Sequence, residues 1–329
     1  MNARIFLKGC YFTLLGRPSA LKPRLEALAS NRLLTVLNLH RIEDREEGPY
    51  RSLTPRLFCD WLGWLKTVFD IVTFGELGTR SSAGKPLLIL SFDDGYKDFI
   101  DTVAPILETN GLRANLNVIP DCADNGLPPM NGLLQDFISA APVSLLRELS
   151  VPGMRGKIDA DRRAAAGLRA SSALKNRPIA EQKAIVETLK PLFERLDGPW
   201  ATPMMTAADV REVSQAHEIG AHSFEHASMA YETDAYLVAD AGRCKTWFRD
   251  HVGLDPQIYA FPNGSLREAQ PAVVRELGYP FVLDVGERFS RPDATLHPRF
   301  TLHADSLGEA RFRAVGGRLD PRSSTQKAS

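Results

Sequence analysis

Short apolar runs recur along the chain, and longer segments with a helical spacing of apolar residues separate them. Seven of these runs have the length and the β-branched or aromatic content of strands, and they span residues 33–40, 69–74, 86–92, 113–119, 217–223, 256–262 and 279–285. Strands that alternate with helices indicate a parallel α/β sheet or barrel, and seven predicted strands favour a barrel over a small open sheet. The pattern therefore predicts a (β/α) barrel of about seven strands.

Four helices are predicted between the strands, over residues 54–68, 98–111, 206–216 and 233–253. The pair Thr54–Pro55 is typical of a helix start, and Gly111 and Gly253 are typical of helix ends. The alternation breaks from about residue 121 to 203, where Pro and Gly breaks precede Ala-, Arg- and Lys-rich helical sequence. We interpret this stretch as a helical insertion beside the barrel mouth, which either shapes specificity as a lid or thickens the barrel wall.

The two ends of the chain differ from the barrel domain, which is predicted over residues 33–315. Residues 1–32 are predicted to be helical and carry five basic residues before the first acidic one, Glu26. This segment either lies on an anionic membrane surface or packs on the barrel as an ordinary helix. No signal peptide or membrane span is recognisable, which favours a cytoplasmic protein, with peripheral membrane contact as the alternative. Residues 316–329 are predicted to form a disordered tail.

The composition fits a globular protein without a strongly charged partner. The chain has 329 residues, of which 44% are hydrophobic, enough for a sizeable core. Lys and Arg number 40, as do Asp and Glu, so the net charge of zero gives no electrostatic argument for nucleic acid or a polyanion as partner. The four cysteines are far apart and form no metal-binding pair or disulfide pattern, which indicates reduced thiols. No oligomeric state is indicated.

Unusual polar residues stand at four strand ends, at the edge where a parallel barrel gathers its reactive groups. The most apolar run ends in the sequence LSFDDGY, which places two carboxylates, Asp93 and Asp94, next to each other. The other endings are LNLH with His40, EIGAHSFEH with His222 and His226, and AFPNG with a tight turn at Pro262–Gly264. Each has an ordinary explanation alone, as a cap, a hydrogen-bonded imidazole or a turn, but their convergence indicates a site.

The residue types at this edge point to a metal ion. Two imidazoles four residues apart and one carboxylate make a three-ligand site for zinc or a similar divalent ion, with one position left open for water. Two adjacent carboxylates oppose each other's ionisation, so the pair needs a cation to neutralise it. The carboxylate that does not bind the ion is then available as a base.

The sequences SFDDG and HSFEH, in this order, resemble the first two motifs of the polysaccharide deacetylases, the NodB-homology enzymes of carbohydrate esterase family four. The resemblance covers roughly residues 33–305, with the helical insertion as an elaboration. It implies a distorted (β/α) barrel and metal-dependent N-deacetylation of an amino sugar. By this resemblance Asp93 is the general base, and the metal ligands are Asp94, His222 and His226.

The third motif departs from the family pattern, in which an arginine orients the base and an aromatic residue contributes its backbone N–H to the oxyanion site. The sequence AFPNG has Ala260 at the arginine position and Asn263 at the aromatic position. The turn at Pro262 is kept, so the Asn263 N–H is expected to face the oxyanion. Arg299, in the late sequence HPRFTLH, is the candidate that replaces the missing arginine.

The family's general acid is a histidine in an L-x-H motif, which this chain matches only in part. In TLH, which ends at His303, and in NLH, which ends at His40, another residue replaces the leucine. Some exopolysaccharide deacetylases are circularly permuted, with the acid-bearing strand at the N-terminus, and TVLNLHRI ahead of SFDDGY resembles that arrangement. His40 is therefore the predicted acid, and His303 and His297 are the alternatives for this role. In the non-catalytic alternative, His40 only caps its strand.

The expected function is hydrolysis of the acetamide of an N-acetylated amino sugar, in a surface polysaccharide or its precursor, with zinc as the expected ion. A deformylase or another amide hydrolase of the same fold is the first alternative, and the release of acetate or formate separates the two. A carbohydrate-binding protein without activity is the second, because the third motif lacks its arginine. This alternative predicts stoichiometric metal binding without turnover.

Overall fold

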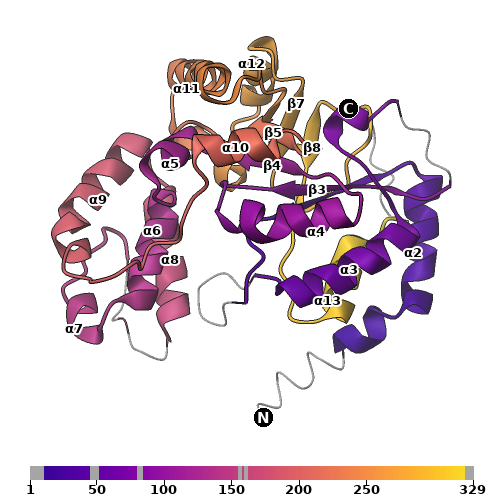
Figure 1. Cartoon of the computed structure of the whole chain (residues 1–329), viewed down its shortest axis with the longest axis horizontal. Coiled ribbons are helices and arrows are strands. Elements are labelled where there is room, and N and C mark those ends of the chain that lie inside the picture. Colours follow the sequence, from indigo (N-terminus) through magenta and orange to yellow (C-terminus); the bar gives the residue numbers. More distant parts are fainter. Residues whose placement is uncertain (1–10, 45–51, 80–83, 155–157, 159–161, 323–329) are drawn as a thin grey trace.

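A parallel sheet forms the centre of the molecule (Figure 1). The structure, a computed structural model, describes residues 11–44, 52–79, 84–154, 158 and 162–322. Its strands are β1 (Leu34–Leu39), β2 (Asp70–Ile71), β3 (Leu87–Phe92), β4 (Asn115–Val118), β5 (Glu218–Ala221), β6 (Ile258–Ala260), β7 (Phe281–Asp284), β8 (Leu296–Pro298) and β9 (Phe300–Thr301). They follow the order β8-β7-β6-β5-β4-β3-β1-β9, and β2 pairs with β3. All pairings between these strands are parallel.

The two ends of this strand order meet, because a single residue, Arg299, separates β8 from β9 in the chain. β8 pairs with β7 and β9 pairs with β1, so the sheet curls into a nearly closed barrel. The predicted distorted (β/α) barrel is confirmed. Arg299 stands at the seam where the barrel closes.

The seven predicted apolar runs each contain a strand, whereas β8 and β9 were not predicted. β1 is buried at all six positions, as its continuous apolar sequence requires for a strand covered on both faces. β8 and β9 have three and two residues, too few to show an apolar period, and Pro298 interrupts the pattern. The structure therefore adds these two short strands to the seven predicted runs.

The helices outside the insertion are α2 (Pro18–Ser30), α3 (Pro55–Val68), α4 (Ala104–Thr109), α10 (Ala207–Val213), α11 (Asp234–Trp247), α12 (Gln270–Glu276) and α13 (Leu307–Ala314). Wider π-helical turns, η2 (Phe99–Val103) and η5 (Phe248–Val252), adjoin α4 and α11, and the 3-10 turns are η1 (Phe74–Glu76), η4 (Met229–Tyr231) and η6 (Pro262–Gly264). The four predicted helices correspond to α3, η2 with α4, α10, and α11 with η5. None of the described helices combines the length and the apolar character that a membrane span requires.

The two ends of the described chain lie against each other. Arg24 of α2 donates a hydrogen bond to the carbonyl oxygen of Leu319 at 3.0 Å. This contact joins the backbone at Leu319 to the N-terminal helix, and the disordered tail over residues 316–329 stays a prediction. Residues 323–329 of the predicted tail and residues 1–10 of the predicted N-terminal segment lie outside the described residues.

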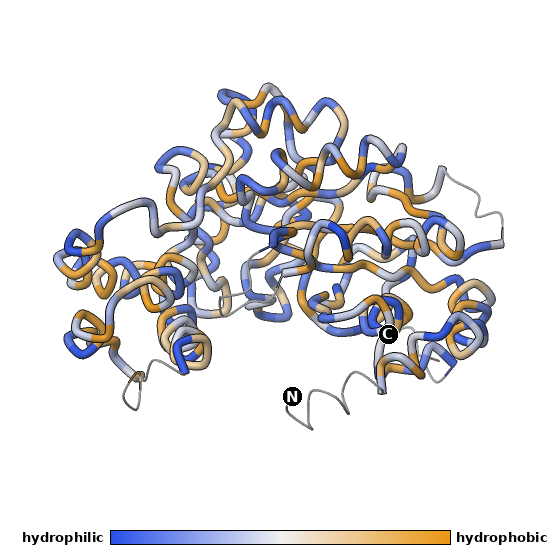
Figure 2. The backbone as a smooth tube through the Cα atoms, turned by 60° about the horizontal axis from the view of Figure 1, so that its bottom comes forward, coloured by the Kyte–Doolittle hydropathy of each residue, from blue (hydrophilic) through white to orange (hydrophobic). Residues whose placement is uncertain are grey.

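Outside residues 155–157 and 159–161, which are not described, the structure has five helices between β4 and α10: α5 (Pro120–Asn125), α6 (Met130–Ala140), α7 (Val143–Leu146), α8 (Arg163–Lys175) and α9 (Ile179–Phe193). Helices α6 to α9 form a lobe at one side of the barrel (Figure 1, left), and the described part of residues 121–203 contains no strand. Apolar and polar residues alternate along these helices (Figure 2). Their apolar side chains form a separate core, in which Phe137 packs against Phe193 and Trp200. The insertion is therefore a packed unit.

Candidate active site

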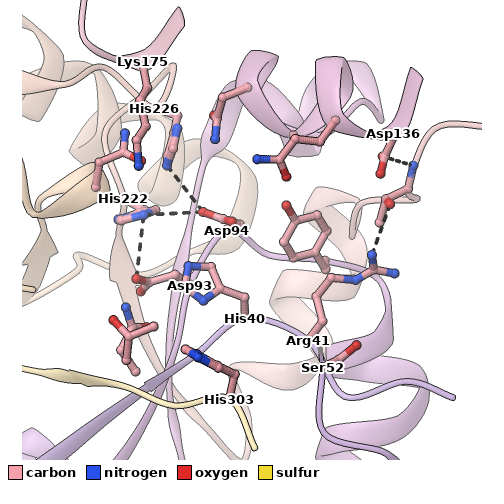
Figure 3. A pocket seen from close by; sticks show the side chains of 18 of the residues that line it. His40, Arg41, Ser52, Asp93, Asp94, Asp136, Lys175, His222, His226 and His303 are labelled. Carbon is pink, nitrogen blue, oxygen red and sulfur yellow. Dashed lines mark hydrogen bonds and ion pairs between the residues drawn. The ribbon is translucent and has the colours of Figure 1, made fainter. Parts of the chain in front are cut away.

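A cavity of about 220 Å³ lies at the carboxyl ends of the barrel strands, between the barrel and the insertion (Figure 3). The barrel and the loops after its strands contribute Asn38, His40, Arg41, Glu43, Ser52, Asp93, Asp94, Tyr96, His222, His226, Asn263, Val285, Thr301, Leu302 and His303. The insertion and the segment that follows it contribute Asn131, Gly132, Gln135, Asp136, Ser139, Lys175 and Thr202. The cavity thus has a barrel wall and an insertion wall.

The three predicted metal ligands meet on the barrel wall. Asp94 Oδ1 lies 3.4 Å from His222 Nε2 and 3.6 Å from His226 Nε2, and one ligand atom of each residue lies within 4.8 Å of the others. Tetrahedral ligands about 2.1 Å from a zinc ion lie ~3.4 Å from one another, so these side chains fit such an ion. Asp94 Oδ1 is buried and has no hydrogen-bond partner among the described residues. A cation would satisfy this oxygen.

The backbone around these ligands adopts an uncommon conformation. Asp94, Ser223, His226 and Asn263 have φ angles of 75°, 60°, 61° and 59° and are four of the six non-glycine residues with positive φ that the structure describes. Such residues cost free energy unless their surroundings impose them, and they concentrate at functional sites. The turns after β3, β5 and β6 therefore aim side chains at one point at the expense of backbone strain.

Buried hydrogen bonds hold the loop that carries the two imidazoles. His222 Nδ1 lies 2.8 Å from the carbonyl oxygen of Ala260, and a proton shared there leaves Nε2 free to face Asp94. Asp240 of α11 accepts hydrogen bonds from the Ser223 hydroxyl and the Phe224 N–H, and also from the Tyr259 hydroxyl. Burial lowers the pKa of His226 to about 4, which keeps this imidazole in the neutral form that binds metals.

Asp93 is paired with the arginine at the barrel seam. Arg299 Nη1 and Nη2 donate to the two carboxylate oxygens of Asp93 at 2.7 and 2.8 Å, and both side chains are at least 98% buried. Burial alone would raise the pKa of Asp93, but Arg299 and His222 lower it well below the ordinary value of a carboxylic acid. Asp93 is therefore ionised at neutral pH, and the two-point contact fixes the orientation of its carboxylate.

Three polar side chains of the inner strand positions complete the surroundings of this pair, and the sequence did not predict them. Asn117 Nδ2 donates to Asp93 Oδ1 at 2.8 Å, and Arg299 Nη1 donates to Ser91 Oγ at 3.1 Å and to Asn38 Oδ1 at 3.4 Å. Asn38 and Ser91 lie two positions before His40 and Asp93 in the largely apolar strands β1 and β3, and Asn117 lies in the neighbouring strand β4. Isolated polar residues at alternate positions were the signal that could have revealed them.

Residues 192–282 match a family model described as polysaccharide deacetylase. The fold is similar to that of Streptococcus pyogenes deacetylase PplD, solved in complex with acetate, with a TM-score of 0.57 and 13% identity over 86% of this chain and 98% of that one. It is also similar to IcaB from Ammonifex degensii, with a TM-score of 0.53 and 16% identity over 86% and 97% of the two chains. No curated protein matches the chain.

The predicted resemblance to the polysaccharide deacetylases is confirmed. A third solved structure, a de-N-acetylase from Aggregatibacter actinomycetemcomitans, has a TM-score of 0.52 and 17% identity over 81% of this chain and 94% of that one. The family match includes His222 and His226 but ends before Arg299 and begins after the Asp93–Asp94 pair. The circular permutation and the roles of the individual residues stay predictions.

The departures from the polysaccharide deacetylase motifs can now be placed. Ala260, at the position of the family's arginine, ends β6. Arg299 contacts Asp93 from a different place, the seam between β8 and β9. Asn263 lines the cavity, and its side chain donates to the Ser228 hydroxyl at 3.1 Å. Pro262 is buried in η6 and is not among the lining residues.

The three histidines considered as the acid differ in position. His40 and His303 both line the cavity (Figure 3). His40 is close enough to Asp93 and His226 to lower the pKa of each; the largest effect on both is burial, which raises the pKa of Asp93 and lowers that of His226. His297 is fully buried in β8, accepts or donates a hydrogen bond at Ser290 and packs against Phe74. His297 lies outside the lining of the cavity.

Proposed function

We propose that this chain is a metal-dependent N-deacetylase, with zinc as its ion, that hydrolyses the acetamide of an N-acetylated amino sugar in a surface polysaccharide or its precursor. The family match and the barrel fold support the deacetylase class. The observation that carries the proposal is that the two adjacent carboxylates at the end of β3 have different partners. Asp94 faces two imidazoles, while its neighbour Asp93 is held by Arg299.

The barrel wall contains groups for binding an ion and for removing a proton. Asp94, His222 and His226 are the residues that would hold the ion. When bound, a divalent ion supplies Lewis acidity to the amide carbonyl and to the attacking water. Asp93 accepts the proton of that water, and the contact with Arg299 keeps its carboxylate ionised and oriented toward the attack.

Two further groups act on the other side of the amide. The Asn263 N–H, in the turn after β6, faces the oxyanion that develops when the carbonyl is attacked. His40 donates a proton to the nitrogen of the leaving amine. Its position at the end of β1, within electrostatic reach of Asp93, supports His40 for this role, and His303, which also lines the cavity, is the alternative. Acetate and a free amino sugar are the products.

The test is a screen of acetylated sugar precursors and oligomers for acetate release by the purified protein, with and without a chelator. Asp94→Ala and His222→Ala should each lose both metal binding and acetate release. Asp101→Ala, which removes an exposed carboxylate paired with Lys97, is the matched control and should keep both. An Asp94→Ala protein that retains metal and activity would contradict the proposal.

The same screen separates the two alternatives. Formate release from formylated sugars, with no acetate from acetylated ones, would identify a deformylase of the same fold. Stoichiometric metal binding, with no product from any sugar amide, would identify a binding protein. The ionised, arginine-paired Asp93 disfavours the second outcome, because a binding protein has no use for a buried carboxylate that is so strongly held.

A further inference from the structure

The insertion wall presents polar side chains to the same cavity as the proposed metal site. Asn131, Gln135 and Ser139 come from α6, and Lys175 comes from the last turn of α8. Figure 3 shows the Lys175 side chain extending from its helix into the cavity in which His226 and Asp94 lie. These polar groups line the cavity, which a lobe that only thickened the barrel wall would not require.

Lys175 is a partly buried cation without a counterion. The other two cations of the cavity region are paired, Arg41 with Glu43 at 2.5 Å and Arg299 with Asp93 at 2.7 Å. Within the described part of the chain, no hydrogen-bond or ion-pair partner contacts Lys175. Burial lowers the pKa of its ammonium group, and no nearby carboxylate opposes this effect.

The acid that shares the insertion wall does not neutralise Lys175. Asp136 accepts a hydrogen bond from the Thr202 N–H at 2.7 Å, and Figure 3 shows it on the opposite side of the cavity from Lys175. The charge of the ammonium group is therefore available to a ligand.

Gln135 supplies a second unused donor. Its side chain is 96% buried, it lines the cavity, and Nε2 has no hydrogen-bond partner among the described residues. A buried amide donor without a partner destabilises the folded state, so native structures retain such a group chiefly where a ligand or water satisfies it. A ligand oxygen at this wall would recover that cost.

We propose that α6 and α8 form a subsite for an anionic group, a phosphate or a carboxylate, attached to the amino sugar that the barrel wall processes. Lys175 pairs with the anion, and Gln135 donates a hydrogen bond to an oxygen of the same ligand. This inference rests on the proposed function for the sugar and adds the charge of the substrate. A single anionic group also agrees with the zero net charge of the chain, which does not favour a polyanion.

The probes are three sugars of similar size: neutral N-acetylglucosamine, its 1-phosphate, and N-acetylmuramic acid, which carries a carboxylate. Their dissociation constants are measured by titration calorimetry with the wild-type protein, Lys175→Met and Lys175→Arg. Lys190→Met is the matched control, because Lys190 on α9 is exposed and pairs with Glu187 outside the cavity. Circular dichroism of each variant verifies the fold.

The wild-type protein should bind at least one anionic sugar more tightly than the neutral one, and the comparison of phosphate with carboxylate identifies the group. Lys175→Met should weaken binding of that sugar by about tenfold or more relative to the neutral sugar, the effect of one lost charge-assisted contact. Lys175→Arg should retain most of the preference, and Lys190→Met all of it. Because a phosphate can also bind at a metal ion, the difference between wild type and Lys175→Met is decisive.

An equal affinity of the wild-type protein for neutral and anionic sugars, or an unchanged preference in Lys175→Met, would overturn the inference. Acetate release from the same sugars is measured separately. A Lys175-dependent preference without acetate release would support the anion subsite and contradict the proposed deacetylase activity. Acetate release without a Lys175-dependent preference would support the deacetylase activity and contradict the anion subsite.

Discussion

The two walls of the cavity differ in how their polar side chains are satisfied. On the barrel wall, Asp93 receives donors from Arg299 and Asn117, and His222 is bonded to a backbone carbonyl. On the insertion wall, Gln135 Nε2 has no described partner, and neither has Lys175.

The difference indicates two kinds of recognition. As the proposed base, Asp93 must be held in one orientation before the substrate arrives, and the barrel does this with Arg299 and Asn117. On the insertion wall, Gln135 Nε2 and the Lys175 ammonium group lack such internal contacts among the described residues, so a ligand is what would complete them. Asp94 Oδ1 is the exception on the barrel wall, since it also lacks a partner and faces the two imidazoles.

The largest effect should follow from breaking the pair at the barrel seam. Arg299→Met leaves the Asp93 carboxylate buried without its cation, and the free energy of unfolding should fall by about 3–5 kcal/mol, with loss of acetate release. Lys175→Met, which breaks no internal hydrogen bond or ion pair of the described residues, should change the free energy of unfolding by less than ~1 kcal/mol. Chemical denaturation of both variants measures the contrast.

The double variant Asp93→Asn with Arg299→Met separates a lost ion pair from a misfolded seam. Removal of both charges should restore part of the stability, because the cost arises from the unpaired carboxylate, but it should not restore activity. Equal destabilisation by Arg299→Met and Lys175→Met would show that the two walls do not differ as the structure indicates.

A second large effect should stay within the insertion. Phe137 is fully buried in the separate core of the lobe, and Phe137→Ala should destabilise this core by about 3–5 kcal/mol. Hydrogen exchange should rise in α6 and α9 but not in β3 or β5. Phe248→Ala, an equally buried change beside the barrel, is the control and should raise exchange around the barrel instead. Faster exchange in β3 after Phe137→Ala would show that the lobe and barrel unfold together.

Much of the barrel wall could be predicted because its signals are local. A continuous apolar run identifies β1 and β3, and polar residues at the ends of such runs identify His40, Asp93 and Asp94 as neighbours. The contact between Arg299 and Asp93 needed more than the sequence. It depends on the closure of the barrel by β8 and β9, which are too short to leave a pattern.

The insertion wall could not be predicted for a different reason. Its sequence indicates helices, but the face that each helix turns to the cavity depends on how α6 packs against α8 and on the core around Phe137. Lys175 in an Ala-, Arg- and Lys-rich helix has the sequence of an ordinary solvated residue. Only the folded lobe distinguishes it from the exposed lysines of α9.

A smaller effect concerns the loop that leads from β1 into the cavity. Asp98 accepts a hydrogen bond from the Ile42 N–H at 2.6 Å, just after His40, and burial raises the pKa of Asp98 to about 6. The unfolded value is about 3.9, so between these values the folded chain binds more protons and loses stability as the pH rises. A shift of about two pKa units corresponds to a loss of about 2–3 kcal/mol in the free energy of unfolding, and this loss from Asp98 is complete above pH ~7.

Asp98→Asn keeps an acceptor for the Ile42 N–H and removes the charge. Its free energy of unfolding should therefore rise relative to the wild type by about 2 kcal/mol between pH 4 and pH 7, measured by urea denaturation. Asp101→Asn removes an exposed carboxylate from the adjoining π-helical turn η2 and is the control. A difference for Asp98→Asn that does not change between pH 4 and pH 7 would mean that water reaches this carboxylate and that the loop is held less firmly than the barrel wall.

The smallest effect should come from an ion pair between the insertion and the loop that carries the two imidazoles. Lys183 of α9 contacts Glu225, which lies between His222 and His226 in the sequence, at 2.7 Å, and the lysine side chain is 51% exposed. Exposed pairs contribute about 0–1 kcal/mol and weaken in salt, and Arg243 also contacts Glu225, so Lys183→Ala should cost less than ~1 kcal/mol and leave metal affinity unchanged. Lys190→Ala, whose pair lies within α9, is the control. A loss of metal affinity in Lys183→Ala, absent from Lys190→Ala, would show that the insertion positions the histidine loop as well as contacting the substrate, and the two walls would then act as one site.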